Sequence, residues 1–176
     1  IEESDAEFVL SLRVDGKYNT YLSKVTPNLD AQRKWISEYK NDESKGVQYY
    51  FIIELNDGTP CGTVRLYDFK GDSFCWGSWI LNEKKTKYAA LESAFLVYQF
   101  GFEQLNFKKS HFDVMKGNEQ VISFHKKLGA IETAHDDDHY YFEIEKENIE
   151  SKKKYFAKHF LLLSYLSLLK ALHRKQ

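Results

Sequence analysis

GNEQVISFHKKLGA, residues 117–130, is the stretch of sequence that decides the fold of this chain. An Asn stands just inside the start of a predicted helix, whose apolar side is formed by Val121, Phe124 and Leu128. His125 lies beside this apolar side, and Gly129 ends the helix, because glycine adopts the left-handed conformation without a steric cost. The strand-like run His111–Met115 precedes the helix, and a second run, Tyr140–Ile144, follows it. The stretch therefore predicts a strand–helix–strand unit.

Outward from this unit, the chain alternates between helical and strand-like periodicity. Further helices are predicted at Ser4–Leu12, Thr26–Lys40 and Tyr88–Leu105. Further strands are predicted at Val47–Leu55, Cys61–Phe69 and Phe74–Leu81. Ser4 is expected to cap the first helix with Glu7 as its partner, and Asn56-Asp57-Gly58 signals a hairpin turn. The chain therefore predicts an α/β fold in which two helices precede a meander of three strands.

Residues 150–176 differ from the rest of the chain in charge. They carry +6, so residues 1–149 carry −7 of a total of −1. Their apolar residues predict a helix from Glu150 to Gln176, and the longest charge-free run, Phe160–Leu169, has ten residues, about half of a membrane span. We therefore divide the chain into a domain, 1–149, and a basic amphipathic helical tail, 150–176. We expect the tail to pack on a second subunit as a homodimer; the alternatives are its own domain and an anionic membrane surface.

Composition and cysteine content restrict the class of protein. With 43% apolar and 29% charged residues, the chain is typical of a soluble globular protein, and a net charge of −1 gives no electrostatic argument for nucleic acid. In the predicted register, Cys61 faces Trp79. Cys75 faces Leu66 instead, so the two thiols do not pair. Reduced thiols and an acidic start without a signal peptide predict a cytoplasmic protein.

In its order and spacing, the unit around residues 117–130 resembles the second cofactor-binding segment of the GNAT superfamily of acetyl-CoA-dependent N-acetyltransferases. The family pattern has an Asn, a Tyr seven residues later and then a Gly, which correspond here to Asn118, His125 and Gly129. The resemblance implies that Asn118 binds the pantetheine arm of acetyl-CoA. It also implies that His125, in the place of the Tyr, protonates the departing CoA thiolate, a role that suits a side chain titrating near neutral pH. The other interpretation of His125 is a surface residue on an amphipathic helix.

The resemblance extends over residues 4–147 and carries an expectation for the fold. It implies a mixed, mostly antiparallel sheet of six or seven strands, flanked by helices, splayed where CoA enters and followed by a C-terminal helical extension. The predicted order of elements lacks only a first strand of the family fold, which we place around Leu10–Val14.

A second cofactor feature is the junction between the strand that ends at Leu81 and the helix that begins near Tyr88. A helix start exposes free N–H groups and the positive end of its dipole, which suits a pyrophosphate. The glycine-rich loop of the family is absent, and lysines supply positive charge instead; a solvated basic loop is the alternative interpretation. Together the two features imply that the cofactor is bound by Trp79, Ile80, Leu81, Lys85, Thr86, Lys87, Tyr88, Ala89, Ala90, Asn118, Phe124 and Lys127.

Two branches of the family resemble different parts of the chain. The start, DAEFVLSLR followed by LDAQRKWISEY, resembles ribosomal-protein N-terminal acetyltransferases. The middle, TVRLYDF and DSFCWGSWIL, resembles small bacterial proteins of surface-glycan and amino-sugar pathways, which acetylate an amine on a nucleotide-linked sugar. We therefore expect acetyl transfer to such an amine; a protein N-terminus and a catalytically silent CoA-binding module are the alternatives. The small-molecule substrate is expected to contact Trp35, Tyr67, Trp76, Ser78 and Asp113.

The sequence leaves the general base open. The candidates are His111, Asp113, Glu54 and Asp68, with Ser78 as a residue that could hold a water. Cys61 and Cys75 lie within predicted strands without a basic neighbour, which predicts direct transfer in a ternary complex and no acetyl-enzyme. The run HDDDH, His135–His139, predicts a hairpin loop and no metal site, because structural zinc usually requires Cys at fixed spacing.

Overall fold

The structure is a computed structural model that describes residues 1–159 and Leu166–Ser167 of the chain. Its strands are β1 (Tyr49–Leu55), β2 (Pro60–Lys70), β3 (Ser73–Leu81), β4 (Lys109–Met115), β5 (Ile131–His135), β6 (His139–Glu145) and β7 (Leu166–Ser167). Its α-helices are α1 (Ala6–Val14), α2 (Leu29–Ser44), α3 (Ala89–Gln99), α4 (Glu119–Leu128) and α5 (Lys146–His159). Two short helical turns are η1 (Glu3–Asp5), of 3-10 type, and η2 (Phe100–Gln104), of π type.

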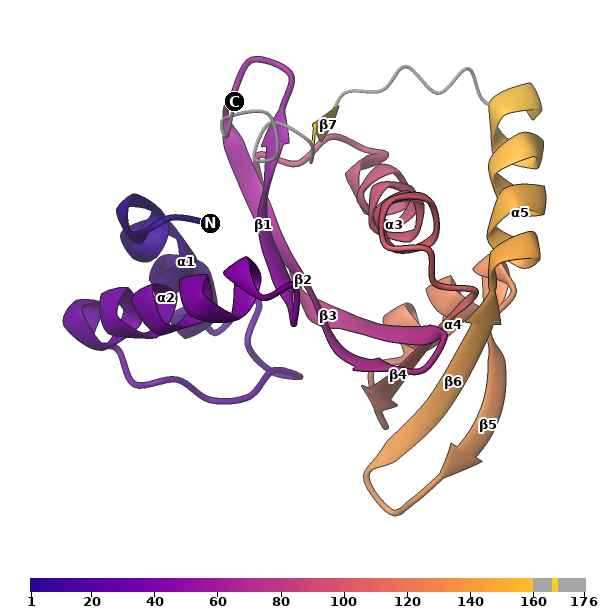
Figure 1. Ribbon diagram of the computed structural model, residues 1–176, viewed down its shortest axis with the longest axis horizontal. Helices are drawn as coiled ribbons and strands as arrows, with labels where there is room; N and C mark the ends of the chain where they lie inside the picture. The colour runs from indigo at the N-terminus through magenta and orange to yellow at the C-terminus, as the bar shows by residue number, and fades with distance from the viewer. Residues whose placement is uncertain (160–165, 168–176) are drawn as a thin grey trace.

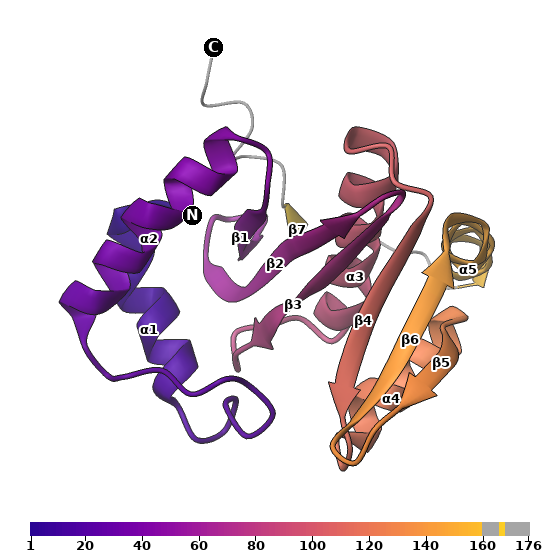
Figure 2. The same cartoon turned by 60° about the horizontal axis from the view of Figure 1, so that its bottom comes forward.

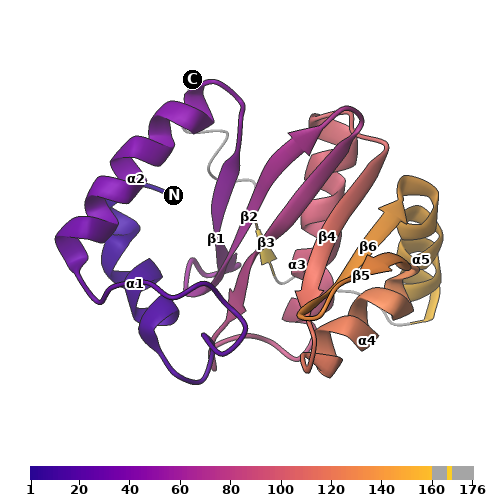
Figure 3. The same cartoon turned by 90° about the horizontal axis from the view of Figure 1, so that it is seen from below.

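The described strands form one sheet in the order β5-β6-β4-β3-β2-β1-β7. Helices α1 and α2 lie on one face of the sheet, and α3, α4 and α5 lie on the other (Figure 1, Figure 3). Strands β3 and β4 run parallel, whereas the other neighbouring pairs of the described sheet are antiparallel. The predicted mixed, mostly antiparallel sheet is therefore confirmed.

The N-terminal segment is helical where a first strand was expected. The stretch predicted as a strand, Leu10–Val14, is the second half of α1. Ala6, Val9 and Leu12 recur every three residues and are buried, so helical spacing decides the local structure. The expected cap is also wrong: Ser4 lies inside η1, where the Glu2 backbone N–H donates to Asp5 Oδ2 at 2.8 Å.

Helix α2 is tied to the edge of the sheet. It begins three residues later than predicted, because Asn28 caps it by accepting a hydrogen bond from the Ala31 N–H at 2.9 Å. Tyr39, which is 2% exposed, accepts a hydrogen bond from the Tyr50 N–H at 2.7 Å. The helix is thereby fixed to β1, and Tyr39 and Tyr50 belong to a small core of their own on this face.

Strands β1, β2 and β3 form the predicted meander, with Gly58 at positive φ (86°) in the first turn. Register shifts in β2 and β3 displace the predicted pairing, so Cys75 lies opposite Tyr67 and not opposite Leu66. Cys61 lies beside Asn82, whose N–H donates to the Cys61 carbonyl at 2.9 Å, and not opposite Trp79. Both thiols are buried and free, so the conclusion that they do not pair holds.

Strands β3 and β4 pair at only two positions before they separate. These are Ser73 with Lys109 and Phe74 with Ser110, and beyond them the two strands diverge (Figure 2). The predicted strand–helix–strand unit follows directly: β4, α4 and β5, with Gly129 at φ 101° after the helix. The divergence leaves the inner edges of both strands without a ladder partner, which creates space for a ligand between them.

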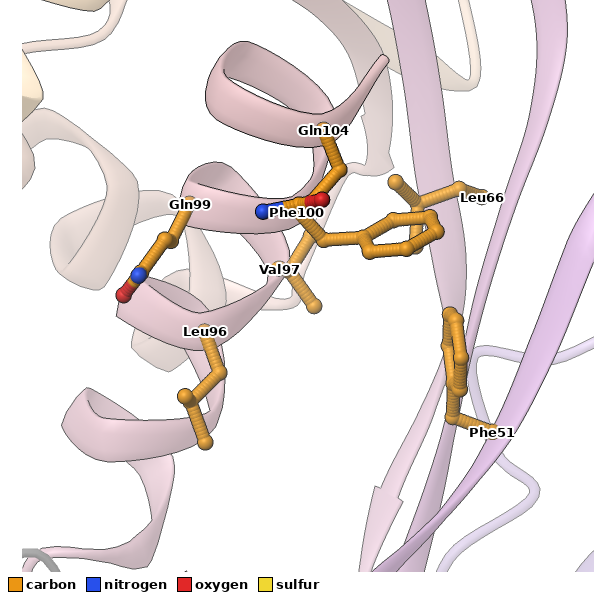
Figure 4. Close-up of a pocket in the computed structure, with 7 residues that line it drawn as sticks. All are labelled: Phe51, Leu66, Leu96, Val97, Gln99, Phe100 and Gln104. Atoms are coloured by element: carbon orange, nitrogen blue, oxygen red, sulfur yellow. The ribbon is translucent and has the colours of Figure 1, made fainter. Parts of the chain in front are cut away.

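The main core lies between the sheet and α3, α4 and α5. Helix α3 continues into η2, in line with the helix predicted at Tyr88–Leu105, and Gly101 passes the ring of Phe74 so closely that a Cβ there would lie 2.3 Å from the ring. A cavity of about 20 Å³ remains between this helix and β1–β2, bounded in part by Phe51 and Phe100 (Figure 4). Such a volume holds about one water, so it is a packing gap and not a ligand site.

The C-terminal segment begins as a helix that packs on the domain. Phe156 contacts Phe95 with ring centroids 6.0 Å apart, and Asn148 Nδ2 donates to the Gly129 carbonyl at 3.1 Å. The predicted boundary between residues 149 and 150 falls inside α5. Leu166–Ser167 form β7 on the edge of β1, so the helix predicted through to Gln176 is wrong at these two residues; 160–165 and 168–176 lie outside the described residues. None of the described helices is both long and apolar enough to cross a membrane.

Candidate active site

The diverging ends of β3 and β4 border a cleft of about 540 Å³, which we call the splay cleft. Its walls come from β2, β3, β4, the first turns of α4 and the start of β6. The end of α1 and residues 21–23, between α1 and α2, complete them. A second cleft, of about 530 Å³, is lined by β2, β3, β4, β5 and β6, and we call it the sheet-face cleft. The two clefts share Tyr67, Cys75, Phe112 and Asp113, so one wall separates them.

Strand β3 is irregular where it borders the splay cleft. Ser78 has a φ of 47°, a left-handed conformation that is uncommon outside glycine, and its carbonyl accepts a hydrogen bond from Thr63 Oγ1 at 3.0 Å. At the preceding position, a Cβ on Gly77 would lie 3.0 Å from the Tyr67 hydroxyl. The bulge and the missing side chain together leave room for the Tyr67 ring and redirect the β3 backbone toward the cleft.

His125 is buried in an aromatic cage on the wall of the splay cleft. The residue is 4% exposed, and its ring centroid lies 4.2 Å from that of Phe112 and 5.3 Å from that of Trp76. Desolvation by burial lowers the pKa of His125 to about 3, so the imidazole is neutral at physiological pH. Its Nδ1 has no hydrogen-bond partner within the described part of the chain. The interpretation of His125 as a surface residue is therefore wrong, and so is the expectation that it titrates near neutral pH.

Two helix starts offer polar groups that fit a CoA molecule. Asn118 precedes α4 and lines the cleft, and its side chain does not cap the helix, so the amide is available to a ligand. Tyr88 provides no side-chain cap for α3, and Thr86 Oγ1 is buried without a partner among the described residues. With the exposed lysines of 84–87 beside it, this helix start fits a pyrophosphate. Ala89 is fully buried, so its small size allows the close approach of loop and helix.

The structure brings together some of the sequence-predicted residues and separates others. The splay cleft contains Tyr67, Trp76, Ser78, Trp79, Asp113, Asn118 and His125. Phe124 packs behind the cleft against Trp79, at 5.2 Å between ring centroids. Leu81 ends β3 just before the loop with Lys85 and Lys87, whereas Ile80 is buried in the sheet, Ala90 is in the first turn of α3 and Lys127 is exposed on α4. Trp35 lies outside both clefts, where it stacks on Tyr39 and contacts the Arg65 guanidinium at 5.4 Å.

The candidates for the general base occupy different places. His111 and Asp68 line the sheet-face cleft, where His111 Nε2 lies 3.3 Å from Asp68 Oδ2 and its Nδ1 lies 2.7 Å from Ser73 Oγ. Glu54 pairs with the strand edge at β7 and lines neither cleft. Asp113 lines both clefts, which makes it the candidate nearest to the diverging strand ends.

Several cleft residues were missed from the sequence. The end of α1 contributes Arg13, and the segment between α1 and α2 contributes Tyr21, Leu22 and Ser23. Tyr21 donates to the Gly117 carbonyl at 2.8 Å, and Lys17 forms an ion pair with Glu83 at 2.8 Å, so this segment is joined to the loops that follow β4 and β3. The segment has no periodicity, and its tyrosines are the one signal that could have indicated a binding role.

The HDDDH run is the turn of the β5–β6 hairpin, as predicted. Asp136 Oδ1 accepts the N–H groups of Asp138 and His139, at 2.9 and 2.7 Å. Within the described residues, no group of three His, Cys, Asp or Glu side chains is arranged to hold a metal ion. Of the two histidines in the run, His139 lines the splay cleft.

Comparison with known proteins supports an assignment. A family described as acetyltransferase (GNAT) domain matches residues 1–131. Apo FdhC, described as a nucleotide-linked sugar GNAT, is 51% identical over 95% of this chain and 92% of its own, with a TM-score of 0.84. Spermidine N-acetyltransferase from Vibrio cholerae, solved with CoA and spermine, is 16% identical over 85% of this chain and 95% of its own (TM-score 0.73). Ribosomal-protein-S5-alanine acetyltransferase from Vibrio fischeri is 14% identical over 84% and 91% (TM-score 0.71). These two share the fold alone. A comparison with curated proteins gave no match.

Proposed function

The chain belongs to the GNAT acetyltransferase family, and from this premise we propose that it transfers an acetyl group from acetyl-CoA to the amine of a nucleotide-linked sugar. The observation that carries the acceptor is the 51% identity over 95% of the chain with FdhC, described as a nucleotide-linked sugar GNAT. The reaction is direct transfer between two bound substrates in a ternary complex.

The residues around the splay cleft provide binding groups for acetyl-CoA, which supplies the activated acetyl thioester. Asn118 holds the pantetheine arm, and Trp79 and Phe124 form the apolar surface beside it. The uncapped start of α3, with Thr86 and the lysines of 84–87, binds the pyrophosphate. Lys85, Lys87 and the loop backbone are the groups that replace the absent glycine-rich loop.

Cysteine chemistry supports direct transfer. Burial raises the pKa of Cys75, which lines the cleft, to about 11, and burial raises the pKa of Cys61 to about 11 as well. A thiol that stays protonated at neutral pH is a poor nucleophile. Neither cysteine is therefore an acetyl carrier, and trapping of an acetyl group on Cys75 would contradict this.

His125 acts on the departing sulfur as a neutral hydrogen-bond donor. A ring N–H of a neutral imidazole is a donor, and the low-dielectric aromatic cage strengthens a hydrogen bond to the developing thiolate. The proton that the thiolate finally takes comes from the reacting nitrogen. Because His125 only donates a hydrogen bond and need not be charged, its contribution does not change with pH near neutrality.

The acceptor binds at the wall that the two clefts share. Asp113, whose side chain is 49% exposed, holds the ammonium group, and Tyr67 and Trp76 provide faces for a sugar ring. Ser78 lies on the β3 bulge and lines the same cleft. Trp35 supports this wall indirectly, because the Arg65 guanidinium lies 5.4 Å from the Trp35 ring and 4.9 Å from the Tyr67 ring.

The test is a transfer assay with a panel of amines. Thiol release is followed with acetyl-CoA and, separately, a nucleotide-linked amino sugar, spermidine and a peptide with a free N-terminus, and the products are identified by mass spectrometry. We expect one acetyl group on the amino sugar and none on the matched nucleotide sugar that carries a hydroxyl in place of the amine. Preference for the peptide or for spermidine would reject the proposed acceptor, and failure of any CoA species to raise the melting temperature would reject the enzyme's cofactor.

The tail is the proposed contact of a cytoplasmic homodimer. Residues 150–176 carry +6 against −7 on the rest of the chain, so an acidic domain, its own or a partner's, suits the tail. The described part of the tail contacts its own domain through Phe156 and β7, so the dimer contact is proposed for the part of the tail beyond α5. Deletion of 160–176 retains the described helix α5, and we expect light scattering to report a monomer for this variant. An unchanged mass would exclude the deleted segment as the contact.

A further inference from the structure

His139 occupies a position in the splay cleft that no role above explains. It is the first residue of β6, and its side chain is 30% exposed. Its Nε2 lies 3.7 Å from Asp113 Oδ2, and its Nδ1 lies 3.7 Å from Asp136 Oδ1. One carboxylate therefore faces each ring nitrogen, and one of them belongs to the wall proposed to hold the acceptor ammonium.

The carboxylate behind His139 is fixed in place. Asp136 Oδ2 accepts the Tyr141 hydroxyl at 2.6 Å, and Oδ1 accepts the backbone N–H groups of Asp138 and His139. The Tyr141 hydroxyl first, and then these N–H groups, lower the pKa of Asp136 to about 2, so it is a permanent anion. The carbonyl of Asp136 is in turn bound by Lys116 Nζ. The imidazole of His139 thus lies between a fixed anion and one that faces the substrate.

The other titratable groups of the cleft do not suit proton uptake from an ammonium. His125 is held neutral by its cage down to acid pH. Burial raises the pKa of the Cys75 thiol and of the Tyr67 hydroxyl, so both remain protonated at neutral pH. Arg13 is cationic, and its Nη2 donates to Ser23. The Tyr21 hydroxyl carries a proton and donates it to the Gly117 carbonyl, so it is not a free acceptor. Asp113 and His139 remain, and a carboxylate is best suited to hold the ammonium, whereas an imidazole is the usual side chain for proton exchange in catalysis.

We infer that His139 is the general base that removes a proton from the acceptor ammonium held by Asp113, a role that rests on the proposed function. The first proton of the ammonium passes to the imidazole, and the freed nitrogen lone pair forms the bond to the acetyl carbon. The carbon–sulfur bond breaks, a second proton from the same nitrogen goes to the sulfur, and the third remains on the amide. The imidazolium, neutralised by Asp113 and Asp136, returns its proton to solvent, to which its side chain is open.

The test compares His139→Asn with His135→Asn in the full-length protein. His135 is at the other end of the same hairpin turn, is 62% exposed and has its own partner, Glu132 at 3.4 Å, so it is a matched control outside the cleft. We expect His139→Asn to lower kcat/KM by about 100-fold, the usual scale for loss of a general base. The affinity for acetyl-CoA stays unchanged, and His135→Asn stays within about twofold of the wild type.

Two readouts separate a base from a structural role. Asp113, Asp136 and Tyr141 surround the His139 ring, and Lys116 binds the carbonyl of Asp136. If His139 is the base, the acid side of the pH profile of kcat/KM disappears in His139→Asn. Added imidazole restores activity to His139→Ala. Retention of wild-type rates by His139→Asn, or a loss with an unchanged acid limb and no rescue by imidazole, would overturn the assignment while the acetyltransferase function stands. A wild-type protein that acetylates no amine would reject both.

Discussion

The α4 region and the β5–β6 hairpin each place a histidine in the splay cleft, in opposite surroundings. His125 on α4 is 4% exposed among aromatic rings, and within the described part of the chain no charged group perturbs its pKa. His139 on the hairpin is 30% exposed at the side chain and has a carboxylate 3.7 Å from each nitrogen. The same side chain is therefore kept neutral by burial on one side of the cleft and faces two carboxylates on the other. Residue type alone does not assign a role in this site; the residues around the ring do.

The largest expected effect concerns buried His125 and is measured as the pH dependence of the free energy of unfolding. Folding holds His125 at a pKa of about 3, below that of an unfolded histidine. Its ionisation therefore adds almost no pH-dependent penalty above about pH 6.5 and destabilises the fold progressively as pH falls from there toward 3. Relative to His125→Leu, the wild type should lose about 3 kcal/mol of unfolding free energy between pH 7 and pH 4. Urea unfolding at a series of pH values measures it. If the wild type lost as much unfolding free energy relative to His139→Asn as relative to His125→Leu, the two histidines would not differ in their surroundings as the structure indicates.

The second prediction concerns the turnover number of variants at His125. His125→Leu removes the N–H donor without adding charge, and we expect kcat to fall by about 100-fold while the dissociation constant of acetyl-CoA changes little. His125→Gln retains an N–H and should keep more of the activity. Steady-state rates with calorimetric titration of acetyl-CoA measure both. Full activity in His125→Leu would show that His125 and the aromatic rings around it contribute to packing and not to catalysis.

A third, smaller effect concerns Asp136, the carboxylate next to His139. Asp136→Asn removes the anion behind His139 but keeps a side-chain oxygen for the hairpin N–H groups. We expect kcat/KM to fall by roughly tenfold or less, since the amide still accepts hydrogen bonds, and the acid limb of the pH profile to move to lower pH. An acid limb that moves to higher pH would contradict an electrostatic role for Asp136.

The smallest expected effect concerns the ion pair between Lys17 and Glu83, which joins the segment between α1 and α2 to the loop after β3. Lys17→Ala breaks an ion pair whose two side chains are 70% and 68% exposed, so the melting temperature should hardly change. The acceptor KM is the quantity expected to rise, by about two- to threefold, because the segment that lines the cleft is held less well. Stopped-flow binding and steady-state kinetics measure it, with Lys24→Ala in the same segment as a control.

Local periodicity accounts for the parts that the sequence predicted. Strand β4, helix α4 and Gly129 follow one another along the chain, so spacing and a single left-handed residue specify them. The family pattern contained Asn118 and His125, and both line the cleft. The resemblance to the family implies a first strand around Leu10–Val14, whereas the spacing of the buried residues in α1 is helical.

Long-range geometry accounts for the parts that were missed. His139 acquires its role from Asp113, a residue on another strand, and nothing in the HDDDH run shows which of its two histidines faces the cleft. The burial of His125 depends on Trp76 and Phe112, which come from two strands that diverge. A helical wheel of α4 does not predict this burial, because the residues that surround His125 come from other strands. Both histidines were visible in the sequence, but their surroundings were not.

The segment between α1 and α2 has a consequence for the timing of catalysis. Through Lys17 and Tyr21 it is fastened to the loops that leave β3 and β4, so protein encircles the gap between the two strand ends. We expect a long, narrow cofactor that approaches from the side to break one of these two contacts, whereas one that slides along the gap need not. On this expectation, product release depends on two surface contacts made by neither His125 nor His139. The turnover number can change in evolution without any change to the chemistry.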